Sequence, residues 1–279
     1  MITSAQKMLM ARAGVPTGGG DVWTDPDLAN ASYDSVSFSV ATEDTQPQEL
    51  FFKPDGTKVY VVGASSDSVI EYDLSTAWDI STASYLQNFS VASQETAPRG
   101  LFFKPDGAKM YVLGDSGNDL NEYDLSTAWD VSSASYLQNF SIGAEETIPQ
   151  GLSFKPDGTK MYVTGSSGQD INEYDLSTAW DISTASFLQN FSVSAQSTLP
   201  QDLFFNPNGN KMYIIDRLNR NVLEYSLSSA WDISSSSYVQ AFDTGSQEQT
   251  PTSLYFKSDG SKMYVLGNQN DTIYQYSTD

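Results

Sequence analysis

The chain has 279 residues, and its 14 Lys and Arg residues against 35 Asp and Glu residues give a formal net charge of −21. It contains no cysteine and no histidine, which excludes disulfides, thiolate catalysis and cysteine-based zinc sites and removes the commonest general base. These absences favour a protein that is not an enzyme and has no cofactor. Nucleic-acid binding requires clustered cations, so the excess of acidic residues also argues against a nucleic-acid partner.

The first 24 residues precede the repeats described below. Residues 1–14 are predicted to form a short helix, and residues 15–20 (VPTGGG) are typical of a flexible linker. An isolated helix of this length is marginal in water, so its apolar side requires a partner. We therefore expect residues 1–24 to be a docking arm. The residues assigned to docking are Met1, Met8, Leu9 and Met10.

Residues 8–11 are the only apolar stretch in this arm. A secretory signal needs about 7–15 apolar residues, so no signal peptide is expected. No run in the chain approaches the length of a membrane span, so we expect no membrane insertion.

The string Phe-Lys-Pro-Asp-Gly recurs every 51 residues. Its first residues are Phe52, Phe103 and Phe154, and altered copies begin at Phe205 and Phe256. Pro, Asp and Gly in this order predict a tight turn, because Pro presets the first angle and Gly accepts a positive one. Five such repeats fill residues 25–279.

Each repeat contains four predicted strands, which in the second copy are residues 101–103, 109–113, 120–125 and 136–142. The first two are apolar on both faces, which is typical of strands between two layers. The fourth is the most polar. A four-stranded unit buried at one edge, in a repeat of this length, predicts a β-propeller blade.

The two ends of the repeat region complement each other. The last repeat stops after its third strand, at residues 272–276, whereas residues 33–40 match a fourth strand, with Phe38 in the position of Phe89 and one extra residue. We predict an all-β, five-bladed propeller of four-stranded antiparallel blades, in which the N-terminal strand completes the C-terminal blade. Such closure removes free sheet edges.

The string Gly-Leu-Phe-Phe-Lys-Pro-Asp-Gly-x-Lys-Met-Tyr-Val resembles the blade motif of lactonase-like and related extracellular propellers over residues 31–279. That resemblance implies the propeller fold, and its lactonase-like members imply a metal in the central channel. The N-terminal SAQKMLMARAG, followed by GGG, resembles bacteriophage virion proteins that attach to the particle by their first residues. It implies other virion proteins as partners.

Acidic residues in the loops are candidates for binding calcium, which oxygen ligands alone can hold. They are not repeated in a common column, so solvated loops are the favoured interpretation, and a calcium site on one blade is the alternative. These residues are Glu43, Asp44, Asp115, Asp119, Glu145 and Glu146.

Four tryptophans recur at one place in the repeat. Packing of one blade on the next is the favoured interpretation, and stacking of a sugar ring is the alternative. They are Trp78, Trp129, Trp180 and Trp231.

Two sets of polar loops, typified by residues 91–100 and 114–119, are expected to share one face of the propeller. Their side chains suit a hydroxyl-rich ligand, and five similar copies favour several weak sites. Arginine is enriched at interfaces, so Arg99, Arg217 and Arg220 are a candidate partner contact. The Phe-Lys-Pro-Asp-Gly turns are interpreted as structural only.

These observations favour a non-enzymatic, virion-associated adhesion protein, a tail or head fibre or decoration protein on the virion surface that is made in the host cytoplasm. It would display the propeller for attachment to a host surface or glycan, and homo-oligomerisation on the particle is left open. The alternatives are a free-standing, lectin-like propeller and a calcium-dependent, lactonase-like hydrolase.

Overall fold

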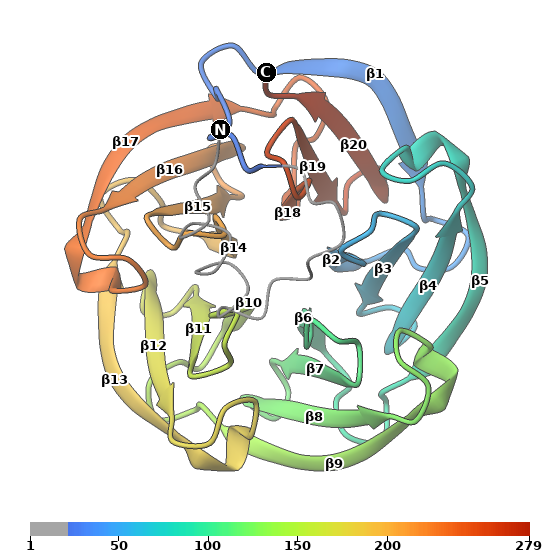
Figure 1. Cartoon of the computed structure of the whole chain (residues 1–279), viewed down its shortest axis with the longest axis vertical. Coiled ribbons are helices and arrows are strands. Elements are labelled where there is room, and N and C mark those ends of the chain that lie inside the picture. The colour runs from blue at the N-terminus through green and yellow to red at the C-terminus, as the bar shows by residue number, and fades with distance from the viewer. Residues whose placement is uncertain (1–21) are drawn as a thin grey trace, which may run out of the picture.

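The computed structural model describes residues 22–279, which form five four-stranded antiparallel sheets around a central axis (Figure 1). The predicted helix and the docking residues Met1, Met8, Leu9 and Met10 lie outside the described residues. No helix of the described part of the chain is long and apolar enough to cross a membrane.

Each blade runs from an innermost strand to an outermost one. Blade 1 consists of β2 (Pro47–Phe52), β3 (Lys58–Gly63), β4 (Ser68–Leu74) and β5 (Ala83–Ser90). Blade 2 consists of β6 (Pro98–Phe103), β7 (Lys109–Gly114), β8 (Asp119–Leu125) and β9 (Ala134–Ser141). Blade 3 consists of β10 (Pro149–Phe154), β11 (Lys160–Gly165), β12 (Asp170–Leu176) and β13 (Ala185–Ser192).

Blade 4 consists of β14 (Pro200–Phe205), β15 (Lys211–Asp216), β16 (Asn221–Leu227) and β17 (Ser236–Asp243). Blade 5 consists of β18 (Pro251–Phe256), β19 (Lys262–Gly267), β20 (Thr272–Ser277) and β1 (Ser32–Ser39). In the first four blades a one-turn 3₁₀ helix precedes the outermost strand. These helices are η1 (Ile80–Thr82), η2 (Val131–Ser133), η3 (Ile182–Thr184) and η4 (Ile233–Ser235). The predicted five-bladed, all-β fold is confirmed.

The ring closes as the sequence predicts, because β1 pairs with β20 (Figure 1). Phe38 lies opposite Ile273, as Phe89 lies opposite Val69 in blade 1. The predicted extra residue lies in a bulge. The pairing of β1 with β20 skips two residues of β1 between Tyr33 and Val36, whereas the pairing of β5 with β4 in blade 1 skips one residue of β5.

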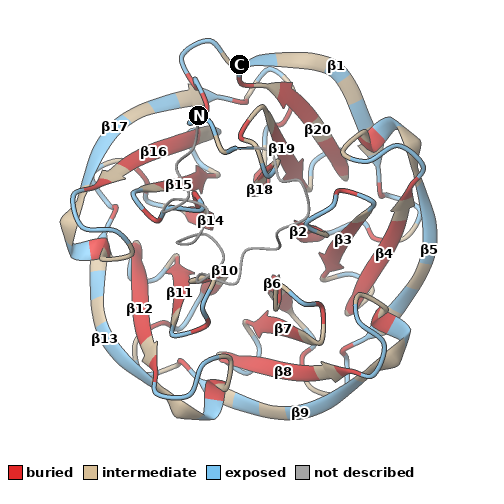
Figure 2. Cartoon of the chain, viewed as in Figure 1, coloured by how far each residue is buried: buried red, intermediate tan, exposed pale blue. Residues whose placement is uncertain are grey.

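Burial follows the order of the strands (Figure 2). The three inner strands of each blade are almost fully buried, as in β3, where five of six residues are buried, whereas β5 alternates between exposed and half-buried positions. Strands that are apolar on both faces fill the layers between neighbouring blades, and the polar outer strands face solvent.

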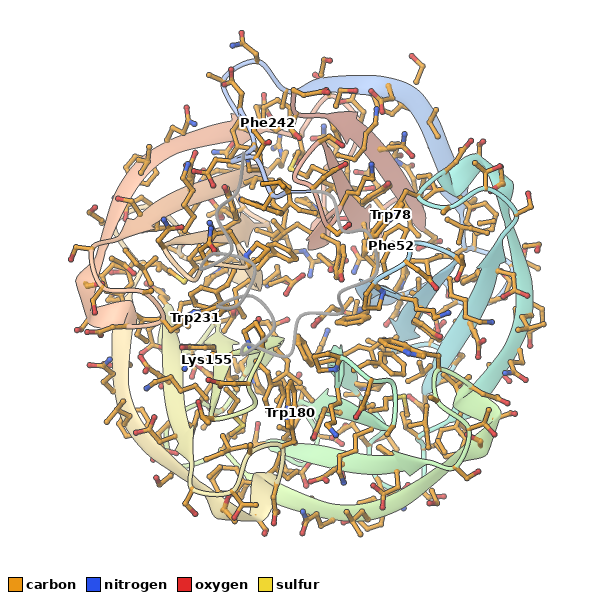
Figure 3. All side chains as sticks on the ribbon, viewed as in Figure 1. Phe52, Trp78, Lys155, Trp180, Trp231 and Phe242 are labelled. Atoms are coloured by element: carbon orange, nitrogen blue, oxygen red, sulfur yellow. The ribbon has the colours of Figure 1, made fainter. Side chains whose placement is uncertain are left out.

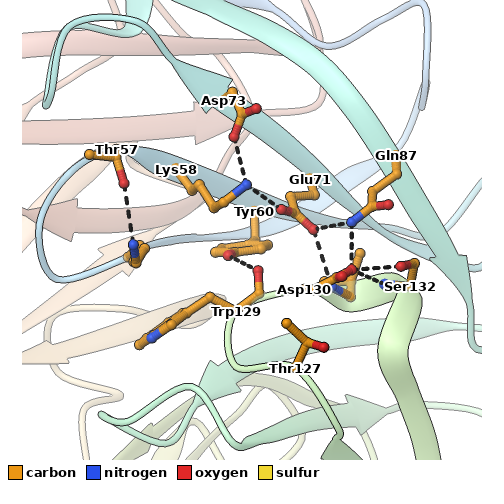
Figure 4. A network of polar contacts seen from close by, with 12 residues as sticks. Thr57, Lys58, Tyr60, Glu71, Asp73, Gln87, Thr127, Trp129, Asp130 and Ser132 are labelled. Carbon is orange, nitrogen blue, oxygen red and sulfur yellow. Dashed lines mark hydrogen bonds and ion pairs between the residues drawn. The ribbon is translucent and has the colours of Figure 1, made fainter.

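A buried ion pair connects each of the first three blades to the next one. In blade 1, Lys58 Nζ lies 2.6 Å from Oε1 of Glu71, whose side chain is 1% exposed. Glu71 Oε2 accepts hydrogen bonds from Gln87 Nε2 at 2.9 Å and from the backbone N–H of Val131 in blade 2 at 3.1 Å (Figure 4). Gln87 also donates to Asp130 of blade 2 at 2.7 Å. The pair therefore holds two blades together.

The bulge in β1 preserves this arrangement in blade 5, where Gln275 replaces the glutamate. Asp34, one of the skipped residues, accepts hydrogen bonds from Lys262 at 2.7 Å, Gln275 at 2.9 Å and Ser277 at 2.6 Å. Hydrogen bonds from these residues hold the pKa of Asp34 below its ordinary value, although its partial burial opposes the shift. Asp34, in the bulge of β1, thus supplies the carboxylate that blade 5 lacks at Gln275.

Candidate functional site

Each Phe-Lys-Pro-Asp-Gly turn is covered by the tryptophan of its own blade. Gly107 has a φ of +74°, which glycine adopts without strain, and a Cβ added there would collide with the ring of Trp129. Trp129 itself has a φ of +65°, an unusual angle for a bulky residue that must be held in place by its surroundings.

The Trp129 ring packs between two blades. It stacks on Phe103 of its own blade at a centroid distance of 5.6 Å and on Phe51 of the preceding blade at 6.4 Å. Tyr60 of that preceding blade donates its hydroxyl to the Trp129 carbonyl at 2.7 Å. Similar contacts recur at Trp78, Trp180 and Trp231, which confirms the predicted packing between blades. Stacking of a sugar on these rings stays a prediction.

Among residues 22–279, the fifth junction has no such connector after β20. Trp23 takes its place and stacks on Phe204 at a centroid distance of 6.3 Å. The Tyr213 hydroxyl, whose equivalents donate to tryptophan carbonyls, has no partner among the described residues. The sequence interpretation did not single out Trp23. The signal that could have found it is the missing connector of the fifth repeat.

Aromatic rings form a bowl where the central channel opens at this end. A ring of side chains from four innermost strands lines it, with neighbouring centroids 5.2–5.4 Å apart. Tryptophans lie around the ring, and Figure 3 shows Trp78, Trp180 and Trp231 around the central axis. The cavity has a volume of about 580 Å³. We call this cavity the aromatic bowl, defined by Phe51, Phe102, Phe204, Tyr255, Trp23, Trp78, Trp129 and Trp231.

The aromatic ring is interrupted at one position. Blade 3 contributes Ser153 where the other four blades contribute Phe51, Phe102, Phe204 and Tyr255. A serine has too little volume to fill the place of a phenyl ring. The rings and Ser153 line the same cavity as Glu49 and Asp202, whose side chains form its floor.

Two buried carboxyl groups and one hydroxyl form this floor. Asp202 accepts hydrogen bonds from the N–H of Leu203 at 2.6 Å, the N–H of Leu254 at 3.0 Å and the hydroxyl of Ser253 at 2.6 Å. The Ser253 oxygen accepts the N–H of Leu50 at 3.1 Å. The side chains of Asp202 and Ser253 thus accept hydrogen bonds from backbone N–H groups of three innermost strands. Buried backbone N–H groups need such partners.

Glu49 is the second carboxyl group and is 4% exposed. Burial and the nearby charge of Asp202 raise its pKa well above the ordinary value, and the N–H groups of Leu101 and Leu152 offset part of the rise. Its Oε2 atom has no hydrogen-bond partner among the described residues. Burial raises the pKa of Asp202 to about 7, against the lowering effect of its three hydrogen bonds.

The sequence interpretation missed this floor. Its column in the repeat reads Glu49, Gly100, Gly151, Asp202 and Ser253, so two acids stand in strands that are otherwise largely apolar. Gly151 is required there, because a Cβ at this position would collide with the backbone of Asp202. The Phe-Lys-Pro-Asp-Gly turns, which the sequence analysis interpreted as structural only, lie around the mouth of the bowl.

The polar loops gather at the opposite end, as predicted. Glu95 accepts hydrogen bonds from the N–H of Ala97 in one loop at 2.6 Å and from those of Ser116 and Gly117 in the other at 3.2 Å. Glu95 is fully buried. Among the acids that the sequence analysis interpreted as solvated, Asp44, Asp119 and Glu146 are also buried, so that interpretation is wrong at these three positions.

The acids in this position also recur every 51 residues, so the expectation that the loop acids share no column was wrong. Buried carboxylates that bind backbone N–H groups between loops explain the recurrence better than ligation does. In the described part of the chain, no three acidic side chains are grouped as a metal site would need. The column contains Asp44, Glu95, Glu146 and Glu248, with Ser197 in blade 4.

The three candidate arginines are not in one place. Arg99 donates to Gln48 and to Asp115, both at 3.0 Å. Burial, and to a smaller extent the charge of Arg99, lower the pKa of Arg217. Arg220 is exposed. A partner contact at these residues stays a prediction.

The fold and the bowl define the class of this protein, a five-bladed β-propeller with an aromatic cavity at one end of its channel. No family model matches the chain, and no curated protein matches it. Among solved structures, a protein from Lactobacillus plantarum is similar, with a TM-score of 0.54 and 14% identity over 84% of this chain and 67% of that one.

Two further structures share a weaker likeness. A functionally unknown protein from Desulfotomaculum acetoxidans has a TM-score of 0.49 and 14% identity over 79% of this chain, which spans 62% of that one. A protein from Bacteroides uniformis, provisionally named a 6-phosphogluconolactonase, has a TM-score of 0.49 and 17% identity over 83% of this chain and 71% of that one. At these identities the likeness describes the fold alone.

Proposed function

We propose that the protein is a non-enzymatic adhesion protein that binds glycans of a host surface in the aromatic bowl. The observation that carries this proposal is a concave cavity of about 580 Å³ lined by tryptophan, phenylalanine and tyrosine rings. Sugar rings present apolar C–H faces that pack on aromatic rings, and their hydroxyl groups need polar partners at the edge. Lys53, Asp55 and Ser258 provide such groups at the rim.

The chemistry of the floor supports binding rather than catalysis. Asp202 is engaged by three hydrogen-bond donors of its own chain. A general acid or base must be free to exchange a proton with a substrate, and a carboxyl group held in this way is better suited to fixing the inner strands.

Binding in the bowl can be tested by glycan array and by titration of tryptophan fluorescence. Phe102→Ala and Phe204→Ala should each weaken binding about 10-fold or more, as loss of a central aromatic contact usually does. Tyr136→Ala is the matched control, because Tyr136 is an aromatic residue on the outer strand β9 and is 44% exposed. A blank array, or equal losses in all three variants, would overturn the proposal.

We further propose that the propeller is displayed on a virion, with residues 1–24 as the docking arm. The support is the apolar character of residues 8–11 and the position of Trp23, which ties the end of this arm to the rim of the bowl. Deletion of residues 1–20 should leave a folded, soluble propeller that binds glycans but is no longer incorporated into particles. Incorporation at the level of the full chain would contradict this role.

A further inference from the structure

The floor of the aromatic bowl carries acidic groups with no basic side chain beside them among the described residues. The hydrogen bonds to Asp202 come from two backbone N–H groups and a hydroxyl, and Glu49 Oε2 has no partner. The one lysine that lines the cavity, Lys53, is paired with Asp55 at the rim at 2.8 Å. The floor therefore places carboxyl groups without a basic partner beneath the rings.

The walls above this floor present aromatic faces. Phe102, Phe204 and Tyr255 are half-buried and line the cavity, so parts of their rings remain accessible. A cation is attracted to the face of an aromatic ring by the ring quadrupole, and this attraction grows when water is excluded. Aromatic walls above acidic groups form an environment that stabilises a positive charge from the side and from below.

We propose that the aromatic bowl selects a ligand with a cationic group, an alkylammonium or a protonated amine, which the rings surround and which Glu49 and Asp202 approach from the floor. This inference rests on the proposed function, in taking the bowl as the binding site, and adds the charge of the ligand. In glycan terms, it points to amino sugars or saccharides that carry a substituted ammonium group.

A neutral ligand would make poorer use of this site. A hydroxyl group of a neutral ligand can donate a hydrogen bond to a carboxyl group, but a neutral ligand gains neither the charge attraction of a carboxylate nor that of the ring faces. An anionic ligand would face two carboxyl groups and a chain with a net charge of −21. A cation is the charge type that both the floor and the walls favour.

The affinity for a cation should rise with pH. Glu49 on β2 and Asp202 on β14 are the titratable groups at the level of the floor, whereas β6, β10 and β18 contribute Gly100, Gly151 and Ser253 there. Burial raises the pKa of both acids, so a cation binds best after a proton has left. Paired Lys53 and Asp55 at the rim and the Tyr255 ring on β18 are the other groups of this kind in the cavity.

The test compares choline with 3,3-dimethylbutan-1-ol, which has the same shape without the charge. Both are titrated into the full chain at pH 8 and 150 mM salt, by calorimetry and by tryptophan fluorescence. Choline should bind at least 10-fold more tightly than the neutral probe, and its affinity should fall between pH 8 and pH 6. Equal binding of the two probes would overturn the inference.

Three variants identify the source of the selectivity. Asp202→Asn should weaken choline binding about 30-fold, as loss of one partner of a buried charge pair does. Phe204→Leu keeps apolar volume but removes a ring face, so it should weaken choline about 3- to 10-fold and leave the neutral probe unchanged. Asp124→Asn is the control, since Asp124 is an exposed acid that pairs with Lys109, and it should change neither.

The outcomes separate this inference from the proposed function. If neutral glycans bind in the bowl and choline does not, the bowl is a glycan site without charge selectivity and the inference is wrong. If neither class binds, both proposals are wrong. If Asp202→Asn proves unstable, Phe204→Leu still decides, because a loss confined to choline supports the cation site and an equal loss for both probes contradicts it.

Discussion

Replacing Lys109 with methionine is expected to lower the free energy of unfolding by about 3–5 kcal/mol, because it leaves the buried carboxylate of Glu122 without its cation. The Glu122 side chain is 1% exposed. It accepts hydrogen bonds from Lys109 Nζ at 2.5 Å, from Gln138 Nε2 at 2.8 Å and from the backbone N–H of Ile182 in blade 3 at 3.4 Å. Hydrogen bonds to Asp124 and Glu122 raise the pKa of Lys109, although its burial opposes the shift. The loss would appear in urea unfolding at neutral pH.

Lys104→Met is the matched control in the same blade. Lys104 pairs with Asp106 at 2.7 Å, but the Asp106 side chain is 55% exposed. An exposed pair contributes about 0–1 kcal/mol, so this variant should be nearly neutral. Equal destabilisation by both substitutions would show that the Lys109–Glu122 pair does not hold blade 2 to blade 3.

The second large effect is a pH dependence of stability that depends on Asp202. The pKa of its carboxyl group is raised from 3.8 to about 7 in the folded chain. Between these values the folded state keeps a proton that the unfolded state has released, so this group stabilises the fold at low pH. That contribution is lost as the pH rises through about 7. From pH 5 to pH 8 the loss amounts to about 3 kcal/mol.

Asp202→Asn removes the titrating group, so the variant should show a shallower decline of unfolding free energy between pH 5 and pH 8. The comparison of the two proteins cancels the other carboxyl groups, which are common to both. The pKa of Glu49 is raised as well, so Glu49→Gln should also flatten the dependence of the unfolding free energy on pH. Parallel profiles for the wild type and both variants would mean that neither acid is protonated within the fold.

The repeat period made the architecture predictable. Columns of apolar residues and the Pro-Asp-Gly turn recur at every copy, so strand order, blade number and closure through residues 33–40 could be predicted from the sequence. Even the bulge at Ser35 was visible as one extra residue. Such features depend on neighbours within a blade, which a repeat displays directly.

The binding cavity was harder to predict, since its residues differ between copies and converge only around the axis. Glu49 and Asp202 are 153 positions apart, three repeats, and they occupy the same column as two glycines and a serine. Trp23 lies outside the repeats and substitutes for a connector that the last blade lacks. The Phe-Lys-Pro-Asp-Gly turns were recognised as a motif, but their shared position around the channel mouth is a property of the closed ring.

The position of a bound ligand can be tested most directly by ¹⁹F NMR of the full chain labelled with 5-fluorotryptophan. The chain has five tryptophans, and all of them lie at the end of the propeller that holds the aromatic bowl. Titration with the glycan that binds best on the array should shift the signals of Trp23, Trp78, Trp129 and Trp231. Saturable binding that leaves all five signals unchanged would place the ligand elsewhere, on the opposite loops, and would contradict the proposed function of the bowl.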